Sequence, residues 1–120
     1  MTKKHQSGRA KLNMKGPHRR AVLRNQMIHL INFGSLNSTK ARVKEVQRLI
    51  ERLVTVARAG YDFNTIRRIK QALPYDFEAV QKLIQEIAPK YVSRPGGYTR
   101  VISLGQRVSD TAPIARLEWV

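Results

Sequence analysis

The sequence lacks cysteine, and it lacks any long apolar run. Without cysteine there are no disulfide bonds, thiolate metal sites or cysteine nucleophiles, and this absence fits a reducing compartment. No stretch approaches the roughly 18–20 apolar residues that a membrane-spanning helix needs. The basic N-terminal residues are not followed by an apolar region, so we expect no secretory signal. A mitochondrial transit peptide, which is also basic and free of acids, stays an alternative.

Acidic residues are missing from the first third of the chain. The first of them is Glu45, and the 44 residues before it hold eleven of the 23 Lys and Arg residues. The net charge of the whole chain is +15, and its pI is about 11.2. Such a chain is expected to bind a polyanion, with nucleic acid ahead of an anionic membrane. A solvated run of charge without a partner is the alternative.

Periodicity and turn residues divide the chain into an arm and one folded domain. Residues 1–16 show no periodicity, which predicts an extended basic arm that an anionic partner orders. Residues 17–120 predict a single α+β domain, with about four helices packed against a small sheet of two or three strands. The four helices are expected from Gly16-Pro17 to Gly34, from Ser38 or Thr39 to about Gly60, from Asn64 to Leu73, and from Asp76 to Pro89.

The last thirty residues change from a helical to a strand-like pattern. Pro95-Gly96-Gly97 predicts a turn, and the following Tyr98–Leu104 is rich in β-branched residues. Ile114–Val120 alternates apolar with charged side chains, which is typical of a half-buried strand. We expect these two strands to pair antiparallel, and the segment near Leu36 is the candidate for a third strand.

Catalytic and metal sites find little support in the sequence. His18 and His29 are eleven residues apart on one predicted helix, hence about 16 Å apart, too far to share an ion. No Ser, His and acidic residue form a recognisable catalytic motif, and Gly96-Gly97 is too short for a phosphate-binding loop. A helix-turn-helix around Pro74-Tyr75-Asp76 is disfavoured because its second helix carries several acids. We therefore expect no enzymatic activity, no metal and no cofactor.

Several sequence blocks occur in order along nearly the whole chain. They are Lys11-Leu12-Asn13 with His18–Asn25, then Ser38–Arg42, then Ala88–Tyr91 with Arg94 and Gly96–Val101, and finally Asp110–Ala115 with Leu117-Glu118. Together they resemble the bacterial-type large-subunit ribosomal protein seventeen family. Two departures are Met14, where the family usually has a basic residue, and Gly16-Pro17, where it usually has Ser or Thr. Residues 60–75 match least.

The resemblance implies a structural, RNA-binding protein of the large ribosomal subunit with an α+β fold. Its expected partners are large-subunit ribosomal RNA and neighbouring ribosomal proteins, near the side where the nascent chain leaves. No small-molecule substrate is expected. The expected location is the cytoplasmic ribosome of a bacterium, with an organellar ribosome as the alternative. The alternative function is that of a free nucleic-acid-binding protein, such as a nucleoid or regulatory factor.

The predicted RNA contacts lie in the arm, on the first helix, at the start of the second helix and around the C-terminal hairpin. Arg and Lys would neutralise phosphates there, while Asn and His would add hydrogen bonds and Tyr a stacking surface. These residues are Lys3, Lys4, His5, Arg9, Lys11, Asn13 and Lys15 in the arm; His18, Arg19, Arg20 and Arg24; Lys40, Arg42 and Lys44; and Arg94, Tyr98, Arg100 and Arg107.

Overall fold

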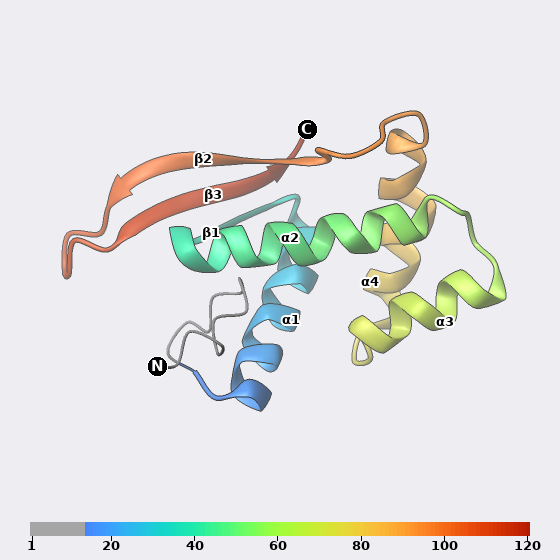
Figure 1. Cartoon of the computed structure of the whole chain (residues 1–120), viewed down its shortest axis with the longest axis horizontal. Coiled ribbons are helices and arrows are strands. Elements are labelled where there is room, and N and C mark those ends of the chain that lie inside the picture. Colours follow the sequence, from blue (N-terminus) through green and yellow to red (C-terminus); the bar gives the residue numbers. More distant parts are fainter. Residues whose placement is uncertain (1–13) are drawn as a thin grey trace, which may run out of the picture.

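The computed structural model describes residues 14–120 and has the predicted α+β architecture. Its elements, in chain order, are α1 (Gly16–Phe33), β1 (Ser35–Thr39), α2 (Lys40–Ala57), α3 (Phe63–Ala72), α4 (Phe77–Lys82), β2 (Thr99–Gln106) and β3 (Pro113–Trp119). In Figure 1, α2 runs through the middle, with the strands on one side of it and α1, α3 and α4 on the other.

Helix α1 begins and ends at the positions that the sequence predicts. Pro17 stands in its first turn, where a missing backbone N–H breaks no helical hydrogen bond. At the other end Gly34 adopts a left-handed conformation with φ 84°, and its N–H donates to the carbonyl of Leu30 at 2.9 Å. A residue with a Cβ is strained at that φ, so glycine is the residue that suits this helix end.

Helix α2 supplies the centre of the hydrophobic core. Val43, Val46, Ile50 and Val54 recur at helical spacing and are fully buried. The helix contacts α1, α3 and all three strands. Because one buried stripe meets both layers, this helix organises the whole domain.

The start of α2 follows the prediction in position but not in chemistry. Thr39 occupies the N-cap position, yet its hydroxyl makes no capping hydrogen bond. The hydroxyl of Ser38 instead accepts a hydrogen bond from Nε2 of Gln26 at 3.2 Å, which ties this corner to α1. Neither predicted side chain therefore caps the helix.

The helical segment that starts at α4 continues beyond its predicted end at Pro89. After α4 the chain forms a π-helical turn over Leu83–Ile87 and a 3-10 turn over Ala88–Tyr91. The N–H of Ala88 donates to the carbonyl of Leu83, five residues back. Pro89 then stands in the first turn of the 3-10 segment, where its missing N–H breaks no hydrogen bond. The wider turn before the proline lets the helical path continue.

The sheet has the order β1-β3-β2, and both pairings are antiparallel. The last strand therefore lies in the middle, with Leu117 opposite both Leu36 and Val101. This confirms the antiparallel pairing of the last two strands and the third strand near Leu36. A bulge between Ser103 and Gly105 shifts the register of β2, and the β2–β3 hairpin extends away from the helices (Figure 1).

Candidate nucleic-acid interface

Most of the predicted arm lies outside the described residues. This applies to the predicted contacts of Lys3, Lys4, His5, Arg9, Lys11 and Asn13. Lys15 is described, is exposed, and occupies the N-cap position of α1. The described part of the predicted interface therefore begins at the first turn of α1.

The first turns of α1 combine positive side chains with an uncapped helix end. Lys15 makes no capping hydrogen bond, and no acidic residue lies in the first turn. His18 and Arg20 are exposed, and Arg19 is half-buried. A helix N-terminus carries partial positive charge and unpaired N–H groups, so these cations add to a field that attracts anions.

Arg24, also predicted to hold RNA, has an internal role in the protein. Its Nε donates to the carbonyl of Ala72 at 3.1 Å. Its guanidinium carbon lies 5.4 Å from the ring centroid of Tyr75, within cation–π range. Arg24 therefore ties α1 to the end of α3 and to the link that follows it.

The start of α2 forms a second cationic helix end. Lys40 and Lys44 are exposed and Arg42 is half-buried, while the first turn holds no acid. The first acidic residue of the chain, Glu45, is only 9% exposed and forms an ion pair with Arg48. The carboxylate of Glu45 therefore lies largely buried against the domain, and the exposed surface at the start of α2 stays cationic.

The two later helices begin differently. Asp62 caps α3 by accepting a hydrogen bond from the N–H of Thr65 at 2.8 Å. Asp76 caps α4 in the same way, through the N–H of Ala79 at 3.0 Å. The hydrogen bond from Thr65 lowers the pKa of the Asp62 carboxyl below its ordinary value. A carboxylate therefore already accepts a hydrogen bond from a backbone N–H at the start of α3 and of α4. No side chain does so at the starts of α1 and α2.

The predicted arginines of the hairpin are engaged within the protein. Nε and Nη2 of Arg100 donate to Oε2 of Glu118 at 2.8 and 2.6 Å. Arg107 forms a similar two-bond pair with Asp110, and the hydrogen bonds from Arg107 lower the pKa of that carboxyl. Arg94 donates to the carbonyl of Gly97 at 3.1 Å. Pairing with acids offsets the charges of Arg100 and Arg107.

The structure contradicts the predicted contact of Tyr98 with RNA. Its side chain is fully buried, with its ring centroid 5.4 Å from that of Tyr91. Its hydroxyl accepts a hydrogen bond from Nη1 of Arg58 at 2.6 Å and lies 3.1 Å from the hydroxyl of Thr55. A ring packed on all sides offers no face to a base, so the expected stacking role is wrong. The sequence predicted Tyr98 as the first residue of the strand, whereas β2 begins at Thr99, so strand alternation does not extend to Tyr98.

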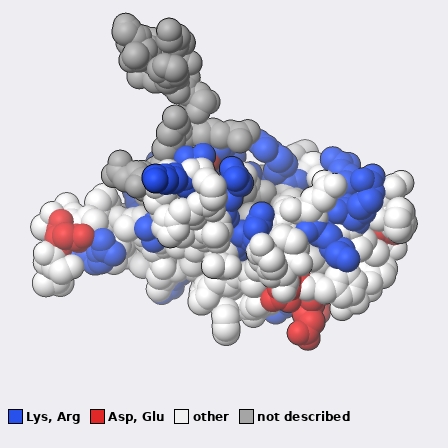
Figure 2. Space-filling view, turned by 90° about the horizontal axis from the view of Figure 1, so that it is seen from below, with Lys and Arg blue, Asp and Glu red and all other residues white. Residues whose placement is uncertain are grey.

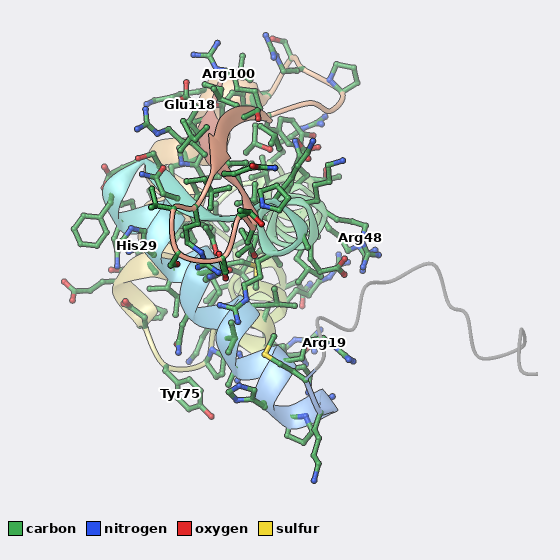
Figure 3. All side chains as sticks on the ribbon, turned by 90° about the vertical axis from the view of Figure 1, so that its left-hand side faces the viewer. Arg19, His29, Arg48, Tyr75, Arg100 and Glu118 are labelled. Atoms are coloured by element: carbon green, nitrogen blue, oxygen red, sulfur yellow. The ribbon has the colours of Figure 1, made fainter. Side chains whose placement is uncertain are left out.

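Several acidic side chains gather in one cleft of the surface. Asp76, Glu78 and Glu86 line one cleft together with Lys82. Figure 2 shows the acids gathered in few places, while Lys and Arg spread over the helices, including the end of the molecule where α3 lies. In Figure 3, Arg19 and Arg48 lie on one side of α1, and Tyr75 and His29 lie on the other.

Two negative findings concern the described part of the chain. Within residues 14–120, no three His, Asp or Glu side chains gather closely enough to hold a metal ion. Over the same residues, no helix combines the length and the apolar character needed to cross a membrane.

The sequence predicted no RNA contact between residues 60 and 75. The structure brings exposed aromatic and basic side chains together there, on α3 and the link after it. One signal in the sequence points to this surface: α3 holds Arg67, Arg68 and Lys70 and no acid.

Comparison with known proteins gives a consistent result. A family model described as ribosomal protein L17 matches residues 22–120. The large ribosomal subunit protein bL17 of Aliarcobacter butzleri is 44% identical over 117 residues, covering 98% of this chain and 99% of the relative. The protein of the same name from Desulforudis audaxviator is 41% identical over 113 residues, covering 94% and 99%. That of Campylobacter jejuni is 43% identical over 117 residues, covering 98% of each.

Proposed function

Because the chain belongs to the ribosomal protein L17 family, we propose that it is a structural constituent of the large ribosomal subunit and binds its ribosomal RNA. The mechanism is neutralisation of phosphates, with release of counterions, together with recognition of the shape of folded RNA. Ribosomal proteins of this family are not a class of enzymes, and we propose no catalytic role for this chain.

One observation supports this mechanism most strongly: the contrast between the helix ends. Helices α1 and α2 begin without a capping side chain or an acid in the first turn, whereas aspartates cap α3 and α4. Phosphate oxygens can accept hydrogen bonds from the unpaired N–H groups and also meet the nearby cations. The residues that we propose for this contact are Lys15, His18, Arg19, Arg20, Lys40, Arg42 and Lys44.

The remaining proposed contacts are secondary. Arg24 borders the first group, and a guanidinium has five N–H donors, of which its contact with Ala72 uses one. Arg94, Arg100 and Arg107 are exposed around the hairpin and keep further donors beyond those in their present hydrogen bonds. Their attraction to RNA is reduced where carboxylates lie beside them. The arm, residues 1–16, adds four further cations ahead of Lys15: Lys3, Lys4, Arg9 and Lys11.

The proposed partners are large-subunit ribosomal RNA and neighbouring proteins of the same subunit. The relatives are bacterial and carry a large-subunit name, which supports a bacterial ribosome in the cytoplasm. The side of the subunit where the nascent chain leaves is the location that the family resemblance favours.

Sedimentation tests the proposal against the alternative of a free nucleic-acid-binding protein. Cell extract is run on a sucrose gradient at high salt, and the chain is located with an antibody. A structural ribosomal protein stays with the large subunit, because many contacts hold it inside folded RNA. Release into the light fractions, together with equal binding to unrelated DNA, would support the free nucleic-acid-binding protein instead.

A further inference from the structure

The outer face of α3 exposes an aromatic ring among basic side chains. Phe63 is 78% exposed, although it begins a helix packed on the core. It borders a shallow groove of about 340 Å³ that is lined by Phe63, Ile66, Arg67, Lys70 and Gln71. Positions 63, 66, 67 and 70 have the spacing of one helix face. The groove therefore follows this face from the start of α3 towards its end.

A second ring, that of Phe77 at the start of α4, lies beside Lys70 of this face. The Nζ of Lys70 is 5.4 Å from the ring centroid of Phe77, which is 46% exposed. In the link between α3 and α4, the side chain of Tyr75 is 80% exposed, and the guanidinium of Arg24 lies over its ring. Phe63 and Phe77 are thus linked through Lys70, which lines the groove with Phe63 and lies over the ring of Phe77. Exposed apolar side chains close to each other mark surfaces that bind a partner.

We propose that this surface, the α3 platform (Phe63, Arg67, Lys70, Gln71 and Phe77), binds unpaired RNA nucleotides by stacking their bases. The proposal rests on the proposed function and assigns to it a second, chemically different RNA site. Every base has a π face that can lie on an aromatic ring, and nearby cations meet the phosphates. The Gln71 amide offers both a donor and an acceptor to base edges.

Charge favours RNA over a protein partner at the α3 platform. The charged side chains of α3 are Arg67, Arg68 and Lys70, and all are basic. Three acids adjoin the platform in sequence. Asp62 and Asp76 direct their carboxylates to the N–H groups of Thr65 and Ala79 at the helix starts. Glu78 lines a separate cleft that contains none of the groove residues. An apolar protein surface would have to remove water from these cations without compensating them. An RNA with unpaired bases can stack those bases on the rings and place its phosphates beside the cations.

The test compares two RNA probes at one fixed salt concentration, using the full-length protein. One probe is a labelled single strand of about 12 nucleotides, and the other is the same sequence as a duplex. Phe63→Ala should weaken single-strand binding by about 5- to 150-fold and leave duplex binding nearly unchanged. Phe63→Trp should retain binding because it keeps a ring. Phe63→Leu should lose binding as Phe63→Ala does, because it keeps only apolar bulk.

A matched control separates stacking from general exposure of aromatic side chains. Phe33 on α1 is 73% exposed, similar to Phe63, and packs on His29 rather than among cations. Phe33→Ala should leave both affinities unchanged. All these positions are exposed, so circular dichroism should report folded proteins throughout.

The possible outcomes distinguish this proposal from the proposed function. Unchanged single-strand affinity in Phe63→Ala, with ribosomal RNA still bound, overturns the α3 platform alone. Full single-strand affinity in Phe63→Leu also overturns it, and would indicate a site for an apolar protein surface. Failure of the unaltered protein to bind large-subunit ribosomal RNA, while it still prefers the single strand, overturns the proposed function instead.

Discussion

The carboxylate of Glu51 on α2 accepts two hydrogen bonds from Thr99, the first residue of β2. The backbone N–H of Thr99 donates at 3.1 Å, and its hydroxyl donates at 2.7 Å. Gln47, one turn earlier on α2, donates to the carbonyl of Thr99 at 3.4 Å. Thr99 is only 5% exposed, so these contacts take the place of water and fix the hairpin to the central helix.

Glu51→Ala should therefore destabilise the protein. The substitution leaves the buried N–H and hydroxyl of Thr99 without an acceptor, which costs about 1–3 kcal/mol in free energy of unfolding. Urea unfolding followed by circular dichroism measures this loss. Arg52→Ala, at the exposed next position on α2, serves as the control and should change stability by less than about 0.5 kcal/mol. Equal stabilities of the two variants would show that the Glu51–Thr99 contact contributes little.

The double substitution Arg19→Gln and Arg20→Gln should weaken binding to ribosomal RNA and reduce its dependence on salt. Removing one cation that neutralises a phosphate reduces the slope of log K against log salt by about 0.7–0.9, so the pair should reduce it by about 1.5. Fluorescence titration of a large-subunit RNA fragment at several salt concentrations gives this slope.

The matched control for that experiment is Lys82→Gln with Lys90→Gln. It removes the same charge outside the proposed contact at the start of α1. Lys82 lines the cleft that holds Asp76, Glu78 and Glu86, and Lys90 lines a neighbouring cleft together with Lys82. Its salt slope should stay close to that of the unaltered protein. Equal losses in both double variants would mean that net charge, rather than the start of α1, governs binding.

Neutralising the arm should affect binding but not folding. Lys3, Lys4, Arg9 and Lys11 replaced by Gln should reduce the salt slope by about 3, if each meets one phosphate. The unfolding midpoint in urea should not move, because the buried core is formed by residues from Leu23 onwards. An unchanged slope would remove the arm from the proposed interface.

Asp62 should make stability depend on pH in the acidic range. Its pKa is lowered in the folded protein, so its stabilisation is fully present above about pH 4 and is lost as the pH falls through the lowered value. Asp62→Asn can still cap α3 but does not titrate. The unaltered protein should therefore lose stability more steeply than this variant as the pH falls below about 4. Parallel urea-unfolding curves across that range would exclude the linkage.

Much of the fold follows from local rules that the sequence displays openly. Pro17 and Gly34 delimit α1, and Asp76 caps α4, because each rule needs only neighbouring residues. The end of the last helix does not follow in this way. Passage through Pro89 depends on a π-helical turn that changes the hydrogen bonding before the proline, and no local signal announces that turn.

The candidate interface was predictable in outline only. Charge patterning locates the cations of α1 and the start of α2, but it cannot tell which arginines find partners inside the fold. Arg100 meets Glu118 only because β2 and β3 pair in one particular register. Tyr98 is buried by Arg58 and Tyr91, residues brought to it by tertiary packing. Contacts between residues so far apart in sequence cannot be predicted from a pattern along the chain.

The position of β3 between β1 and β2 constrains the order of events during synthesis. Ser35 of β1 pairs with Glu118, and Thr99 of β2 pairs with Trp119, so neither outer strand has its partner until residues 113–119 have been made. The helices can pack earlier, but the sheet closes in a late step that depends on contacts distant in sequence. A chain cut short before residue 113 would carry two strands without their partner, and exposed strand edges of this kind favour aggregation.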